Sequence, residues 1–231
     1  MQTKYFSSKN IFKEAWSYFT RHIVLLVSAS LLYMFLPAAI DQVLRAFSPF
    51  LVESSSSSWL LPIRQALSGL TYLLQLWLLV GLSKICLNIT NNKPAGFQDF
   101  LIPFKVFIRF LGSWFLFCLI VIGGLILLII PGFIWALKYM FYPYLILDKG
   151  LGSVDAIKAS AKLTDGVKWQ LAGFFFLSIL MGIIGVLCLV VGVLVAFPVI
   201  FIAQALIYRN LYRQTFGQQP SGSVANEALS N

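Results

Sequence analysis

The longest apolar stretch, 110–147, contains a single charged side chain, Lys138. A straight helix of about 38 residues would be about 57 Å long, nearly twice the roughly 30 Å thickness of a bilayer's hydrocarbon core. Proline cannot continue a helical hydrogen-bond ladder, but it starts a helix well. We therefore predict two membrane helices folded back on each other, with the corner at Ile130, Pro131 and Gly132.

The same argument extends to the whole chain. The mean hydropathy is +0.87 and 11% of residues are charged, against about a quarter in soluble domains. Soluble globular classes are thereby excluded. The apolar runs predict six spans, at about 23–44, 63–85, 112–130, 131–147, 168–188 and 192–211.

Shorter amphipathic segments precede each pair of spans, at about 10–21, 97–109 and 153–165. In the first, Ile11, Ala15 and Phe19 recur at helical spacing, which is typical of a helix at the bilayer surface. The predicted fold is therefore an all-α integral membrane domain over 1–212. It has six transmembrane helices in three hairpins, each hairpin preceded by a cytoplasmic amphipathic helix. The three units are either internal repeats or a pattern imposed by insertion.

Two segments lack the periodicity of helices. The serine run 54–58 is typical of a flexible linker. The polar end of the chain, 213–231, predicts a disordered cytoplasmic tail.

The basic residues predict the orientation. Of the 17 Lys and Arg residues, all but Lys138, Arg45 and Arg64 lie before the first span, after the last, in the segments joining the second to the third and the fourth to the fifth, or at the span ends that border these segments. Positive charge is retained on the cytoplasmic side. We therefore expect a multipass protein of the bacterial inner membrane with both termini in the cytoplasm, and without a cleaved signal peptide.

Catalytic chemistry has little support in the residue types present. The only histidine is His22, and Cys86, Cys118 and Cys188 lack metal-ligand spacing. We expect no metal, no cofactor and no enzymatic activity. The basic residues lie in short segments between apolar runs, so we also expect no nucleic-acid partner.

Lys138 is the first candidate for a site inside the membrane. A lysine near the bilayer centre costs roughly 2.5–3.5 kcal/mol, and such residues are often functional. Together with Trp135, Tyr139 and Tyr142 it could attract an anionic lipid or solute. Alternatively, its ammonium reaches the outer interface or the free carbonyls of the preceding helix, and the aromatic residues are packing residues.

A second candidate is a set of lysines at the cytoplasmic interface. The set contains Lys149, Lys158, Lys162 and Lys168. Anionic headgroups attract such residues by about 1 kcal/mol each, so membrane lipids are the expected partners. The alternative is that these lysines only set the topology. A protein partner or a homo-oligomer stays open.

The region 127–169 resembles a bacterial family that comprises the YciC-like inner-membrane proteins and the membrane domain of some glycerophosphoryl diester phosphodiesterases. The matching elements are Pro131-Gly132, Trp135, Lys138, Tyr139, Tyr142-Pro143, Asp148, Gly150-Leu151-Gly152, Ala156, Ser160 and Gly166-Val167-Lys168-Trp169. The opening Phe12, Ala15, Trp16 and Phe19 is similar as well. The resemblance implies a six-helix membrane domain, and Lys138 stands where that family more often has arginine. The phosphodiesterase domain is absent from this sequence, so that activity is not implied.

Two functional classes follow. The first is a non-enzymatic membrane protein concerned with envelope or lipid homeostasis. The second is a small transporter or permease for a lipid or small anionic solute. A gathering of Lys138, Gln75 and Gln204 on one facing side would favour transport, whereas a packed interior would favour the first class.

Overall fold

The computed structural model describes residues 6–52 and 60–217, and every regular element in those ranges is a helix. In chain order the elements are α1 (Ser8–Arg21), α2 (Ile23–Val52), α3 (Leu60–Thr90), the 3₁₀ helix η1 (Phe97–Phe100), α4 (Phe104–Leu127), α5 (Ile129–Tyr139), α6 (Tyr142–Lys149), α7 (Ser153–Leu163), α8 (Lys168–Leu187) and α9 (Leu189–Phe216). The described residues provide six segments long and apolar enough to cross a membrane. The predicted all-helical, six-span class is confirmed.

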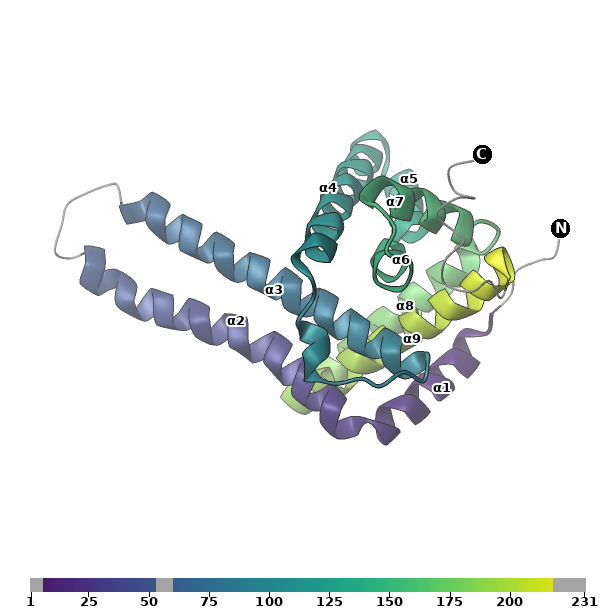
Figure 1. The fold of residues 1–231 in the computed structure, drawn as a ribbon, viewed down its shortest axis with the longest axis horizontal. Helices are drawn as coiled ribbons and strands as arrows, with labels where there is room; N and C mark the ends of the chain where they lie inside the picture. Colours follow the sequence, from purple (N-terminus) through teal and green to yellow (C-terminus); the bar gives the residue numbers. More distant parts are fainter. Residues whose placement is uncertain (1–5, 53–59, 218–231) are drawn as a thin grey trace.

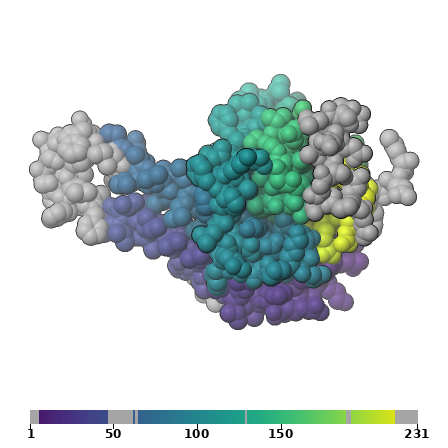
Figure 2. All heavy atoms as spheres, in the orientation of Figure 1, coloured from purple at the N-terminus to yellow at the C-terminus, as the bar shows by residue number. Residues whose placement is uncertain are grey.

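Helices that follow one another in the chain lie side by side. α2 packs along α3, α4 along α5, and α8 along α9. In Figure 1 the α2–α3 pair projects from the rest of the molecule, and the far end of the α4–α5 pair points in another direction. The space-filling view shows the α2–α3 pair as an arm beside a wider body (Figure 2).

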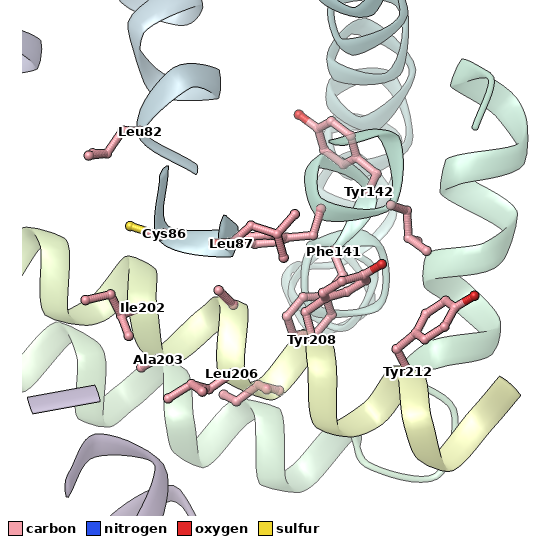
Figure 3. Close-up of a cluster of buried hydrophobic side chains, with 14 of the residues drawn as sticks. Leu82, Cys86, Leu87, Phe141, Tyr142, Ile202, Ala203, Leu206, Tyr208 and Tyr212 are labelled. Carbon is pink, nitrogen blue, oxygen red and sulfur yellow. The ribbon is translucent and has the colours of Figure 1, made fainter. Parts of the chain in front are cut away.

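Two long helices form the centre of the body. Half of the apolar window of α9 (50%) and 44% of that of α3 are buried, against 17% in α4 and in α8. Figure 3 shows residues of α3, α6 and α9 meeting in one buried cluster. The labelled members are Leu82, Cys86, Leu87, Phe141, Tyr142, Ile202, Ala203, Leu206, Tyr208 and Tyr212. The centre of the core is therefore built by α3, α6 and α9, and α1 and α7 each add a buried face to it. Most of α4 and α8 is not buried.

The opening helix α1 lies against the C-terminal half of the chain. Its residues Ile11, Ala15 and Phe19 are buried, and the ring of Phe12 stacks on that of Phe174 in α8 at 5.4 Å between centroids. Trp16, whose ring lies 5.6 Å from that of Phe19, is at the edge of this face and is 51% exposed. The periodicity seen in the sequence is thus the periodicity of packing against α8 and α9.

The predicted helix over 97–109 is wrong. The chain forms only the four-residue η1 and then starts α4 at Phe104. Pro103 explains the interruption, because its ring would clash with the carbonyl of residue 99 in a continuous helix. η1 is held against α3, where the Trp77 indole donates to the Phe100 carbonyl at 2.7 Å and Lys84 pairs with Asp99 at 3.2 Å.

The fourth span is also not a single helix over 131–147. It consists of α5 and α6, separated at Met140 and Phe141. Pro143 lies in the first turn of α6, and in an unbroken helix its ring would clash with the carbonyl of Tyr139. α5 therefore ends at Tyr139.

The limits of the predicted segments differ elsewhere too. The corner before α5 falls at Leu128, whose backbone is extended, so Pro131 lies inside the first helical turn, where its missing N–H costs nothing. The helix α9 continues to Phe216, so the predicted disordered tail does not begin at 213. The rest of that tail and the serine run lie outside the described residues.

Candidate functional site

The break between α5 and α6 is the most elaborate polar arrangement in the fourth span. The main-chain carbonyl of Lys138 accepts hydrogen bonds from the Ser160 hydroxyl at 3.1 Å and from the Thr164 hydroxyl at 2.9 Å. The N–H of Phe141 donates to the Ser160 oxygen at 3.2 Å. A broken helix exposes backbone groups that hydrocarbon cannot satisfy. Here the two hydroxyls provide partners for the Lys138 carbonyl and the Phe141 N–H.

Both hydroxyl residues come from the end of α7. Ser160 and Thr164 are one helical turn apart and fully buried, so they face the break together. The buried face of α7 also contains Ala156, Ile157 and Leu163. α7 is therefore packed against the membrane helices by one face.

The loop before α7 is tied to α4. Gly150 ends α6 with a left-handed backbone (φ 64°), a conformation that favours glycine. Its carbonyl accepts a hydrogen bond from Arg109 at 2.6 Å. The Ser153 hydroxyl donates to the carbonyl of Arg109 at 2.8 Å, and the Ser113 hydroxyl donates to that of Ser153 at 3.0 Å. These bonds fix the start of α7 on α4.

The four residues predicted to form an intramembrane site have different neighbours. The Lys138 ammonium lies 5.7 Å from the centre of the Tyr139 ring. Tyr142 is buried between Phe110 and Phe117, with centroid distances of 5.7 and 5.6 Å. Trp135 lies against Gly124, where a Cβ would approach its Cε3 to 2.7 Å. The structure thus brings Lys138 and Tyr139 together, while Trp135 and Tyr142 pack against α4.

The four interfacial lysines also divide. Lys158, Lys162 and Lys168 are exposed. The Lys149 side chain is only 11% exposed, and its ammonium lies 3.4 Å from the Asp148 carboxylate and 4.5 Å from the centre of the Tyr212 ring. Lys149 is therefore largely buried, whereas Lys158, Lys162 and Lys168 are exposed.

Sequence reasoning missed a buried tyrosine network between α6 and α9. The Tyr208 hydroxyl donates to the Asp148 carboxylate at 3.0 Å. The Tyr144 hydroxyl donates to the Phe201 carbonyl at 3.2 Å and lies 3.4 Å from the Gln204 side-chain oxygen. The spacing of polar residues on α9 at 204, 208 and 212 was the available signal, because it places them on one helical face.

The described residues do not form a metal-binding cluster. Within 6–52 and 60–217, no group of three or more His, Cys, Asp or Glu side chains is placed to hold an ion. The hydroxyls of Ser160, Thr164, Tyr144 and Tyr208 instead bond to the backbone or to a carboxylate, which is the behaviour expected of a packed membrane interior.

Three mycobacterial proteins are similar to this chain over almost its whole length. The uncharacterised protein Mb2590 of Mycobacterium bovis is 26% identical over 237 residues, covering 95% of this chain and 71% of the relative. The uncharacterised proteins MT2637 and Rv2560 of Mycobacterium tuberculosis strains are 26% and 25% identical with the same coverage. No family model matches the chain, and no solved structure matches significantly. These relatives are themselves named as uncharacterised, so they indicate no function for this chain.

Proposed function

We propose that this chain is a non-enzymatic, multipass protein of the bacterial inner membrane that contacts anionic lipid and supports membrane or envelope homeostasis. In this proposal α2–α3, α4–α5 together with α6, and α8–α9 are three membrane hairpins, and α1, η1 and α7 lie on the cytoplasmic side with both termini. The resemblance to the YciC-like membrane family agrees with this class of protein.

The observation that carries the proposal is the two-sided character of α7. One face is buried through Ile157, Ser160 and Thr164, while Lys158 and Lys162 are exposed. Lys168, at the start of α8, is exposed beside them along the chain. A helix packed on the membrane domain by one face and lysine-bearing on the other is suited to contact anionic headgroups, at about 1 kcal/mol for each lysine.

Transport is the second candidate, because discontinuous helices are common in transporter sites. However, the polar span residues have separate local partners. Gln204 is close to the Tyr144 hydroxyl, and Gln75 on α3 is within hydrogen-bonding reach of Tyr33 on α2. The break itself is filled by hydroxyls of α7. These placements favour a packed interior, and hence the lipid-contact function.

The test measures lipid selectivity at the protein surface. The full chain is reconstituted in phosphatidylcholine bilayers with a small amount of spin-labelled phosphatidylglycerol, and the motionally restricted fraction is recorded. We expect the wild type to enrich the anionic lipid, and the triple variant Lys158→Gln, Lys162→Gln, Lys168→Gln to lose most of that enrichment.

A matched control removes three exposed lysines from other elements, with Lys9→Gln, Lys13→Gln and Lys105→Gln. If the control loses as much selectivity as the triple variant, the lysines act only through total charge and the proposed role of α7 fails. A wild type without selectivity for the anionic lipid would refute the proposed function as a whole.

A further inference from the structure

A cavity of about 240 Å³ lies between α1 and α9, apart from the break between α5 and α6. Its lining consists of Ile11, Glu14, Leu206, Arg209, Asn210 and Arg213. The α9 residues are at positions i, i+3, i+4 and i+7, which places them on one face of that helix, and Ile11 and Glu14 are one turn apart on α1. Two helices therefore present their facing sides to one volume.

The cavity has an apolar floor and a charged rim. Ile11 and Leu206 are 5% and 4% exposed, whereas Glu14, Asn210 and Arg213 are exposed. Four of the six lining residues are polar, so the cavity is more polar than the mostly apolar sites of drug-sized ligands. The volume is below the roughly 300–1,000 Å³ of sites for drug-sized ligands, so it suits a molecule of headgroup size.

The charges in the cavity favour an anion. Two guanidinium groups and one carboxylate give a net positive charge, and within the described part of the chain no salt bridge joins Glu14 to Arg209 or Arg213. Arg209 is held in place by donating to the carbonyl of Thr90, the last residue of α3. A guanidinium has five N–H donors, so this capping bond leaves donors of Arg209 available to the cavity.

We propose that this cavity binds a phosphate-bearing molecule of headgroup size, with its phosphate between Arg209 and Arg213. Arginine suits phosphate because its planar fork donates two parallel hydrogen bonds. The Glu14 carboxylate then accepts a hydrogen bond from a hydroxyl group next to the phosphate, and the Asn210 amide donates one to such a hydroxyl. Glycerol phosphate carries hydroxyl groups in this position. The molecule is either the headgroup of a phospholipid or a free phosphate ester, since both offer the same chemistry.

This inference depends on the proposed function in one respect: α1 and the end of α9 lie at the cytoplasmic membrane surface. It does not depend on the exposed lysines of α7 and of the start of α8. A variant lacking Lys158, Lys162 and Lys168 is therefore expected to keep the cavity's affinity, and a cavity variant is expected to keep the selectivity for annular anionic lipid.

The experiment uses the full chain in dodecyl maltoside, a detergent without phosphate, and calorimetric titration with two probes. The first is dihexanoyl phosphatidylglycerol and the second is glycerol phosphate. We expect saturable binding of at least one probe, weakened about tenfold or more by Arg213→Gln, because a hydrogen bond to a charged group contributes at least that much. Arg213 is exposed, so this variant is expected to fold.

Arg21→Gln is the matched control, since it removes an exposed arginine of α1 outside the cavity, and its affinity is expected to equal that of the wild type. Binding of the lipid alone identifies the headgroup as ligand, and equal binding of glycerol phosphate identifies a free phosphate ester. The proposal is overturned if neither probe binds saturably, or if Arg21→Gln weakens binding as much as Arg213→Gln does.

Discussion

At Lys138 the main-chain carbonyl has clearer structural partners than the ammonium. The carbonyl accepts two hydroxyl hydrogen bonds from α7, while the ammonium has a ring contact at 5.7 Å. Substitution of the Lys138 side chain and disruption of the carbonyl's partners should therefore have different effects on stability. Unfolding of the detergent-solubilised protein can separate them.

Ser160→Ala is expected to destabilise the protein by about 1–3 kcal/mol, because it leaves the buried N–H of Phe141 without its hydrogen-bond acceptor. Lys138→Met should leave stability unchanged or raise it, because it removes a costly charge and keeps the backbone. Denaturant unfolding followed by circular dichroism measures both effects. The control is Ser178→Ala, whose hydroxyl only donates to the Phe174 carbonyl within α8. A loss in Lys138→Met as large as in Ser160→Ala would contradict the assignment.

The two tyrosines one turn apart on α9 give a second comparison. Tyr208→Phe removes the hydrogen bond to Asp148 and is expected to cost about 1–3 kcal/mol. The Tyr212 hydroxyl is buried and has no hydrogen-bond partner among the described residues, so Tyr212→Phe should cost less than Tyr208→Phe. Thermal unfolding of the two variants in the same detergent decides the order. Equal losses would show that the hydrogen bond to Asp148 contributes little.

At the scale of the helices, the pair α4–α5 depends on a close approach of backbones. A Cβ at Gly124 would lie 2.8 Å from the Gly132 Cα, whereas a Cβ at the neighbouring Gly123 would meet nothing within 4 Å. Gly124→Ala is therefore expected to destabilise by about 1–3 kcal/mol through overpacking. Gly123→Ala should be neutral or stabilising, because alanine is the better helix former by about 1 kcal/mol. Unfolding in detergent distinguishes these two single-methyl changes, and a stable Gly124→Ala variant would refute the close packing.

The positions of the long helices could be predicted from hydrophobicity alone. Apolar runs of bilayer length specify the spans because hydrocarbon leaves the backbone no partner other than the helix itself. The interruptions at Pro103 and Pro143 were readable in principle, since each proline excludes the carbonyl of a particular earlier residue. The amphipathic pattern across 97–109 and the apolar length of 131–147 each predicted one continuous helix. The proline in each segment interrupts that helix instead.

The candidate site was less accessible to sequence reasoning. The hydroxyls that stabilise the break come from residues 160 and 164, about twenty positions beyond the carbonyl that they bind. The cavity lining joins residues 11–14 to 206–213. Such pairings depend on how helices pack, and no local pattern in the chain encodes them. The exposure of Lys158, Lys162 and Lys168 was predictable, because charged side chains in a short segment between two apolar runs indicate a surface position.

For the whole molecule, the basic residues predict that both ends of the chain lie in the cytoplasm. Fusion of a fluorescent protein that folds only in the cytoplasm, placed after residue 217 or before residue 6, is expected to give fluorescence in both cases. Alkaline phosphatase, which is active only outside the cytoplasm, should be inactive at both positions. Active phosphatase at either end would invert or break the six-span topology.

The hydroxyls that fill the gap between α5 and α6 also have a consequence for biosynthesis. The ribosome makes α5 and α6 before it makes Ser160 and Thr164. During synthesis the Lys138 carbonyl therefore lacks its hydroxyl donors, and the Phe141 N–H lacks its hydroxyl acceptor. Chains released at residue 152 would lack them permanently. We therefore expect the packing of α5 against α6 to be completed only after α7 has left the exit tunnel, and a nascent chain stalled before residue 164 to be a substrate for membrane quality control.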